Sequence, residues 1–481
     1  METLNTFLET VNSYLWGNVL AYLLLGAGLY FTVRTGAVQF RYFWQGVREM
    51  VGGMRHQTPG SISPFQAFAT GMASRVGVGN IAGVAIAISL GGPGAVFWMW
   101  MTALVGMASS VVECTLAQVY KERQPDGTYR GGPAYYIRRG LGNGPLAVAF
   151  AVAVLLAFGF AFNAIQSNTI ASVLEQSYGW KPWVVGGFLV LISAPILGGG
   201  VRKVGLVAEF MVPVMAGFYF LLTLYVMGKN WMEIPAVLSL IVQSAFGFGP
   251  AVAGFAGYTV GQGMMMGARR GLFSNEAGMG SAPNAAAMAE TQHPATQGFL
   301  QMFGVFIDTI LVCSCTAFLI LLSGVFVPGQ EVEGVRLTQD ALQSEIGPWS
   351  RHFLALAIFF FAYSSIIGNY AYAEGNVTYL KNGRLPVRVF RLLVLGMVYL
   401  GAVAKVNLVW QLGDLSQALM VGINLIALLG LSKTALAVVQ DFTAQRRAGV
   451  HHPIFHPKNI PELQGALTEW REPLEHRIPQ S

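Results

Sequence analysis

Long runs of apolar residues alternate with short polar stretches along this chain of 481 residues. A helix needs about 20 apolar residues to cross a bilayer, and about eleven runs approach that length. These runs lie near residues 14–33, 64–90, 94–119, 144–176, 183–200, 204–228, 250–290, 298–327, 352–374, 389–404 and 413–437. The pattern predicts an all-α polytopic membrane protein with about eleven transmembrane helices.

Composition agrees with this class. Hydrophobic residues make up 54% of the chain and charged residues only 11%, whereas an ordinary soluble domain has about 25% charged residues. The first run is preceded by Glu2 and Glu9 but by no Lys or Arg. Because a signal peptide carries a basic leading segment, we expect this run to be a retained helix.

The Lys and Arg residues are unevenly distributed between the two sets of loops. Most of the 29 fall after the first, third, fifth and ninth runs and in the C-terminal tail. Cytoplasmic loops carry the excess of positive charge, so we expect the N-terminus outside and the C-terminus inside, across a plasma membrane. The net charge of +6 is then an orientation signal, and no nucleic-acid partner is needed to explain it.

Ten runs remain when the first is set aside, and they divide five and five around residues 229–250. The two halves would have opposite orientations, as in inverted repeats whose ligands bind between broken helices near the midplane. The predicted division is an extra helix and loop, two five-helix repeats and a cytoplasmic tail: 1–63, 64–228, 229–440 and 441–481.

The first apolar run of each half contains many helix-weakening residues. These are "TGMASRVGVGNIAGVAIAISLGGPG" (70–94) and "GARRGLFSNEAGMGSAPNAAAMAE" (267–290). Corresponding segments interrupted by Gly and Pro indicate a transport site. Within "GVGN", from Gly77 to Asn80, freed N–H groups would resemble an anion-binding helix start. For Gly83, Gly91 and Gly92 close helix packing is the simpler interpretation.

Polar residues inside the runs are further candidates. Ionisable groups at membrane depth are functional hypotheses by default, and here they are Arg75, Glu113, Glu209, Glu276, Asp308 and Glu374. An interfacial position stays open for Glu113, and Arg75 is expected to face an acidic partner. Uncharged polar residues cluster on the fourth and ninth runs: Asn163, Gln166, Ser167, Ser364, Ser365 and Asn369. Together they favour a polar cavity, although interhelical hydrogen bonding could explain any single one.

Four motifs resemble the alanine or glycine:cation symporter family, the sodium:alanine symporters. They are "ASRVGVGNIAGVAIAISLGGPGAVFWMWMTALVGM", "DGTYRGGPAYYI", "GLFSNEAGMGSAPNAAA" and "SSIIGNYAYAE". That family is similar in fold to the leucine-transporter-type sodium symporters. The resemblance implies a 5+5 inverted repeat of ten helices, with one extra N-terminal helix in front.

The resemblance also implies roles for individual residues. The substrate carboxylate would meet the N–H groups of Gly77, Val78 and Gly79, with Asn80 supporting the turn. The amino group would find Gln166 and Asn275. Ser365 and Asn369 would complete the pocket. A sodium ion would bind two carbonyls and two hydroxyls, those of Ala73, Val76, Ser364 and Ser365, because hard cations prefer oxygen ligands.

Asn369 departs from the family pattern. Many members carry Trp there, in "GWY" where this chain has "GNY", and that Trp closes the pocket around a small side chain. With Asn369 we expect a roomier, more polar pocket. The "NYxYAE" branch includes members linked to glutamine as well as alanine and glycine.

The implied function is sodium-driven uptake of small neutral amino acids by alternating access, with alanine, glycine, serine and glutamine as candidates. A proton-coupled symporter, with Glu276 or Asp308 as carrier, is the alternative. The breaks differ from one another and show no fourfold pattern, which disfavours a channel. An enzyme is also disfavoured, because HExxH and GxSxG are absent and the three cysteines all fall within apolar runs.

Overall fold

The computed structural model of the chain describes residues 2–55, 61–247, 259–327, 334–460, 463, 467, 469 and 470. Seven helical stretches among them are long and apolar enough to cross a membrane. They comprise α7 (Gly94–Val119), α9 (Gly144–Val154) continued by α10 (Phe162–Tyr178), α12 (Gly200–Lys229), α16 (Ala295–Val305) continued by α17 (Ser314–Leu322), α19 (Ser350–Leu380), α20 (Arg384–Val403) and α21 (Val406–Gly430). The prediction of an all-α polytopic membrane protein is confirmed.

Shorter and bent helices account for other predicted runs. Three apolar helices have 10–17 residues: α2 (Ala21–Arg34), α11 (Pro182–Gly198) and α13 (Ile234–Phe246). A bent pair adds an eighth candidate span. The predicted run at 250–290 lies partly outside the described residues.

Several helices occupy segments in which the sequence analysis expects loops or a polar tail. They are α4 (Phe43–Arg55), α13, α18 (Gly334–Ile346) and α22 (Ser432–Arg447). Two of them, α4 and α22, contain both apolar and charged residues. A search for uniformly apolar runs therefore does not find them.

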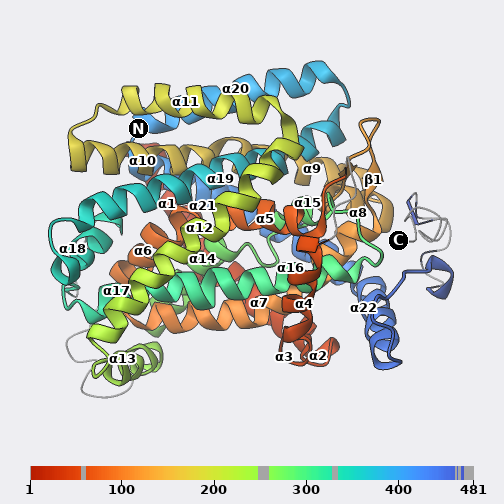
Figure 1. Cartoon of the computed structure of the whole chain (residues 1–481), viewed down its shortest axis with the longest axis horizontal. Coiled ribbons are helices and arrows are strands. Elements are labelled where there is room, and N and C mark those ends of the chain that lie inside the picture. The colour runs from red at the N-terminus through yellow and green to blue at the C-terminus, as the bar shows by residue number, and fades with distance from the viewer. Residues whose placement is uncertain are drawn as a thin grey trace.

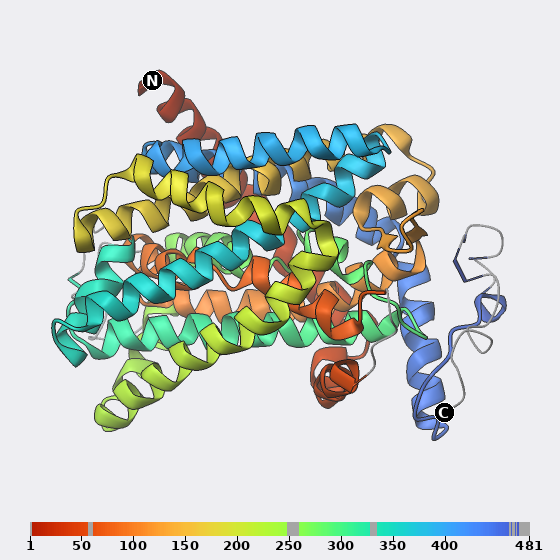
Figure 2. The ribbon, with the colours of Figure 1, turned by 45° about the horizontal axis from the view of Figure 1, so that its top comes forward.

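The long helices lie side by side, roughly along the longest axis of the molecule (Figure 1). At one end lie α13 and α18. At the other lie α22, α8 (Pro133–Gly140) and a hairpin of β1 (Glu122–Arg123) and β2 (Tyr129–Arg130). Helices α11 and α20 form an outer layer over α10 in both views (Figure 2). Because the long apolar helices would cross a bilayer along their length, we expect the two ends of the bundle to lie at the two faces of the membrane.

The first interrupted helix consists of α5 (Pro64–Arg75), a π-helical turn (Gly79–Gly83) and α6 (Val84–Gly91). Ser63 caps α5 by accepting the N–H of Gln66, whose side chain accepts the N–H of Ser63 in return. The two halves meet at an angle of 48°. The bend lies at "GVGN", where the sequence places the break.

The second interruption follows α14 (Val260–Asn275) and precedes the short helix α15 (Ala282–Ala286). Glu276 has a left-handed backbone with φ 59°, and Gly278 and Gly280 also have positive φ. Beyond α15, the N–H of Glu290 donates to the carbonyl of Ile62 at 3.0 Å. Because Ile62 lies two residues before α5, the two interrupted segments are joined at one end of the bundle.

Candidate functional site

Side-chain amides satisfy the backbone of the first break. The Gly77 N–H donates to Asn80 Oδ1 at 2.8 Å, and the Val78 N–H donates to Gln166 Oε1 at 3.1 Å. Gln166 comes from α10, so α10 packs directly against the break. The structure therefore brings Gly77, Val78, Asn80 and Gln166 together. Two amide oxygens accept from N–H groups that the sequence analysis assigns to the substrate carboxylate.

Close approach explains the glycines of this break. A Cβ at Gly77 would overlap Ser365 Oγ, and one at Gly79 would lie 3.0 Å from the Phe273 ring. Gly91 is also tightly packed, since a Cβ there would lie 2.8 Å from the Met266 Cβ. At Gly83 the nearest atom would be 4.0 Å away. The close-packing interpretation of Gly83 is therefore wrong.

Oxygen atoms converge where α19 crosses the end of α5. Ser364 Oγ lies 3.5 Å from the Val76 carbonyl, and Ser365 Oγ donates to the Ser74 carbonyl at 3.0 Å. The carbonyl carbon of Ala73 lies beside Gly368, where an added Cβ would come within 3.1 Å of it. All these residues are buried. The last carbonyls of a helix carry the negative end of its dipole, so this set suits a small, hard cation.

A chain of hydrogen bonds joins this crossing to the second break. Asn369 Nδ2 donates to Asn163 Oδ1 at 3.1 Å. Ser74 Oγ lies 2.7 Å from both Asn369 Oδ1 and Glu276 Oε1, and Ser281 Oγ donates to the other oxygen of Glu276. The chain thus connects α10, α19, α5 and the loop after α14. Asn163 and Ser74 belong to this network although neither is among the predicted ligands.

A second buried carboxylate, that of Asp308, connects the two breaks on another side. It accepts Asn80 Nδ2 and Ser274 Oγ, each at 2.7 Å, and Thr309 Oγ1 at 2.9 Å. Asn275 Nδ2 donates to Thr309 Oγ1 at 3.1 Å. Asn275 is therefore turned toward Thr309 and reaches the first break through Thr309 and Asp308. It also lines a small pocket between α2, α7 and α14.

Glu113 has a different position from the interfacial one left open for it. It is fully buried in α7 and accepts the N–H groups of Gly278 and Gly280 at 3.0 and 3.1 Å. Asn424 Nδ2, from α21, donates to the same carboxylate at 3.0 Å. Glu113 thus holds the unwound segment between α14 and α15. The signal in the sequence is an acid in one apolar run and a Gly-rich run elsewhere whose N–H groups need acceptors.

Arg75 points away from the oxygen cluster, toward α16. Its Nη1 donates to the backbone carbonyl of Gln301 at 3.1 Å. Within the described ranges it has no ion pair within 4.0 Å, so the predicted acidic partner is not in direct contact. Arg75 interacts electrostatically at longer range with Glu276, Glu113 and Asp308. Glu209 accepts from Gln66 Nε2 near the start of α5.

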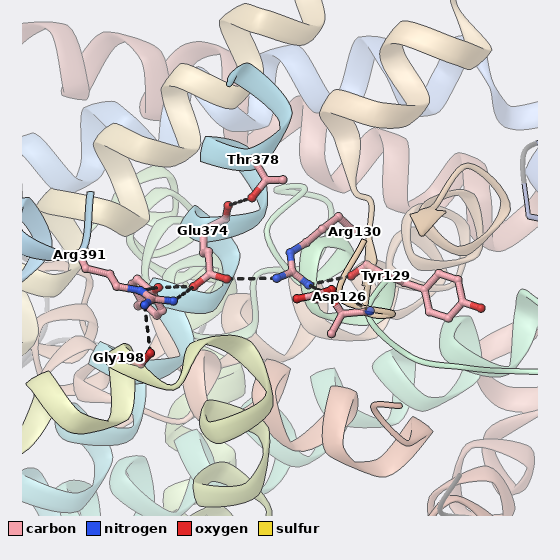
Figure 3. A network of polar contacts seen from close by, with 9 residues as sticks. Asp126, Tyr129, Arg130, Gly198, Glu374, Thr378 and Arg391 are labelled. Carbon is pink, nitrogen blue, oxygen red and sulfur yellow. Dashed lines mark hydrogen bonds and ion pairs between the residues drawn. The ribbon is translucent and has the colours of Figure 1, made fainter. Parts of the chain in front are cut away.

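Glu374 lies in an ion-pair network at the end of the bundle that carries β1 and β2 (Figure 3). One carboxylate oxygen pairs with Arg130 Nη2 at 3.1 Å, and the other pairs with Arg391 Nη2 at 3.5 Å. Arg391 also donates to the Gly198 carbonyl at 3.0 Å. The network ties β2, α19, α20 and α11 together. It joins two of the recognised motifs, "DGTYRGGPAYYI" and "SSIIGNYAYAE", in one contact.

Comparison with known proteins gives a consistent result. The model of the family described as "Sodium:alanine symporter family" matches residues 1–457. The chain is similar to "Amino-acid carrier protein AlsT" of Bacillus subtilis, with 46% identity over 97% of this chain and 98% of that protein. It is 46% identical to "Probable sodium/glutamine symporter GlnT" of the same organism, over 98% and 96%. It is 38% identical to "Sodium/alanine symporter AgcS" of Methanococcus maripaludis, over 92% and 98%.

Proposed function

Since this chain belongs to the sodium:alanine symporter family and is a multi-pass membrane transporter, we propose that it takes up small neutral amino acids together with sodium. Alanine and glycine are the first candidates. Glutamine and serine come next, because one relative is named for glutamine and the pocket position 369 holds a small amide. The proposed site is the bacterial inner membrane, with the N-terminus outside and the C-terminus cytoplasmic.

The observation that carries this proposal is the meeting of two interrupted helices among buried polar side chains. We interpret them as the first helices of two inverted repeats, 64–228 and 229–440, in a leucine-transporter-type fold preceded by the extra segment 1–63. Such interruptions are tolerated at membrane depth where the backbone lines a cavity or is satisfied by neighbouring groups. Here Asn80, Gln166 and Glu113 supply those groups.

The substrate carboxylate is proposed to bind at the N–H groups of Gly77, Val78 and Gly79. The amide oxygens of Asn80 and Gln166 accept from the first two of these N–H groups. A carboxylate would therefore replace amide oxygens of the same hydrogen-bonding type, and Gln166 would be released toward the amino group. Asn275 would join the site when Thr309 releases it, while Ser365 and Asn369 line it from α19.

Sodium is proposed to bind between the carbonyls of Ala73 and Val76 and the hydroxyls of Ser364 and Ser365. Binding there would fasten α5 to α19 and so preorganise the carboxylate site. Because linkage is reciprocal, sodium and substrate would each raise the affinity for the other. Alternating access would follow as the loaded carrier rocks between its two faces.

Uptake of labelled alanine or glycine into proteoliposomes tests the proposal. We expect accumulation only with an inward sodium gradient, and saturation with substrate. Equal uptake with and without that gradient would contradict sodium coupling. Uptake driven by a pH gradient in sodium-free buffer would instead support the proton-coupled alternative, for which Glu276 and Asp308 are the buried candidates.

Competition by unlabelled alanine, glycine, serine and glutamine addresses selectivity. The test compares the wild type with Asn369→Trp. Asn369 is buried between Asn163 and Ser74, so a Trp side chain would take up room in the pocket. We expect the range to narrow toward glycine and alanine. An unchanged profile would remove Asn369 from the pocket.

A further inference from the structure

A short helix outside the proposed transport site has one face that no other described part of the chain covers. After α2 ends at Arg34, the chain forms α3 (Val38–Arg41) and α4 (Phe43–Arg55). Only eight residues separate α2 from α4, and α2 is an apolar helix of the membrane bundle. Helix α4 therefore lies near a membrane surface, and it runs across the long helices rather than along them (Figure 1).

The inner face of α4 is packed tightly against the bundle. The Phe43 ring centroid lies 5.5 Å from that of Phe303 and 4.8 Å from that of Phe306. A Cβ at Gly46 would come within 2.8 Å of the Phe299 carbonyl oxygen, and one at Gly53 within 3.1 Å of the Phe65 nitrogen. This packing fixes which side of α4 faces outward, and it places α4 directly on the start of α5.

The outer face combines large apolar side chains with cations. Trp44 of α4 is 70% exposed, and Phe40 of the preceding helix α3 is 63% exposed. Trp44, Arg48 and Val51 follow at intervals of four and three residues, so they share one side of the helix. The exposed arginines Arg34, Arg41 and Arg48 make no ion pair within the described ranges.

The acid of α4 does not neutralise this face. Glu49 is half-buried and accepts from Gln45 Nε2 at 2.6 Å, and Gln45 itself is buried. The outer face thus presents positive charge beside an exposed indole. Tryptophan is enriched at the membrane–water interface, and helices with an apolar and a basic component bind anionic bilayer surfaces.

We propose that the outer face of α4, together with Arg34 and Arg41, binds the headgroups of anionic phospholipids. Trp44 and Phe40 would lie at the level of the acyl-chain boundary, and the guanidinium groups would contact the phosphates. A lipid held there would press α4 onto Pro64 and Phe65. It would thereby stabilise the start of the first interrupted helix.

Fluorescence quenching by brominated lipids tests this site without relying on transport. The protein is reconstituted in vesicles that contain brominated phosphatidylglycerol or brominated phosphatidylcholine at equal mole fraction. The quenching lost in Trp44→Phe gives the share of Trp44. We expect that share to be larger with phosphatidylglycerol, by about fivefold in relative affinity for each arginine engaged.

Charge variants identify the residues responsible. We expect Arg41→Gln with Arg48→Gln to remove most of the preference, leaving only the share of Arg34. The matched pair Arg384→Gln with Arg388→Gln, exposed at the start of α20, should keep it. Raising the salt to about 1 M, where the screening length falls to about 3 Å, should weaken the preference in the unmodified protein, so the test does not depend on a variant.

Three results would overturn the proposal. The first is equal quenching of Trp44 by the two lipids. The second is an equal loss of preference in the α20 pair. The third is a Trp44 shielded from both lipids, which would indicate a protein neighbour such as a second copy of the chain. Because none of these readouts involves uptake, failure here leaves the proposed transport function untouched.

Discussion

Replacing Glu113 should destabilise the second break, because its carboxylate accepts the hydrogen bonds that hold that segment. The carboxylate accepts three hydrogen bonds, from the Gly278 N–H, the Gly280 N–H and Asn424 Nδ2. Its side chain is fully buried in α7. A buried donor left without an acceptor costs about 1–3 kcal/mol, so Glu113→Ala is expected to cost about 3–9 kcal/mol before any relaxation.

Glu113→Gln is the sharper test. The amide oxygen can take the place of the oxygen that accepts from Gly280 and Asn424, but the amide nitrogen would then face the Gly278 N–H. Two donors cannot bond to each other, so one interaction is lost, at about 1–3 kcal/mol. An opposing effect exists, because removing a buried charge relieves desolvation. We expect the loss of the acceptor to outweigh the relief of desolvation, because the groups around the carboxylate are hydrogen-bond donors.

The assay is thermal unfolding of the detergent-solubilised protein, monitored as the fraction of protein that remains monodisperse after heating. Glu209→Gln is the matched control, because Glu209 is half-buried and accepts from the side chain of Gln66, a bond that a glutamine can keep. The expected order of melting temperatures is wild type and Glu209→Gln, then Glu113→Gln, then Glu113→Ala. A Glu113→Gln variant as stable as the control would refute the reasoning.

Three further predictions concern other parts of the fold. Gly77→Ala should abolish sodium-driven uptake, whereas Gly83→Ala should retain it, because an added Cβ overlaps a neighbour only at Gly77; similar uptake by both variants would contradict this. Glu374→Gln should lower the melting temperature, because loss of its buried pair with Arg130 lowers the free energy of unfolding by about 3–5 kcal/mol; an unchanged melting curve would argue against a structural role. Burial lowers the pKa of His293 below its ordinary 6.5. The unfolded chain therefore binds that proton more readily, and the stability of the fold should fall as the pH drops below 6.5. Melting curves at pH 7.5 and 5 should show this loss of stability, and the loss should be smaller in His293→Asn.

The sequence predicts the first break well because two independent signals coincide there. Gly77 and Gly79 weaken the helix locally, while the apolar residues on both sides keep the segment in the membrane. The same combination does not occur in α4. Its faces alternate with a helical period, but its average hydropathy is low, so a search for apolar runs classifies residues 43–55 as part of a basic loop. The helix is visible only when the period is read as well.

Side-chain partners are harder to predict because they depend on contacts distant in sequence. Glu113 and Gly278 are 165 residues apart, and nothing in either local pattern links them. Arg75 shows the converse, since its position in an apolar run suggests an acidic partner and the structure gives it a backbone carbonyl.

The end of α14 shows why even a correctly located break leaves its ligands undetermined. Neighbouring residues on a helix point about 100° apart, and a left-handed residue redirects the chain at once. At Glu276 the backbone turns left-handed, so Glu276 reaches Ser74 of the first break while Asn275 faces Thr309. Had the helix continued by one residue, the Glu276 side chain would point elsewhere. In the proposed mechanism Asn275 leaves Thr309 and turns to the substrate, and the sequence alone could not predict this step. Cross-linking between cysteines at positions 275 and 309, with and without substrate, would detect it.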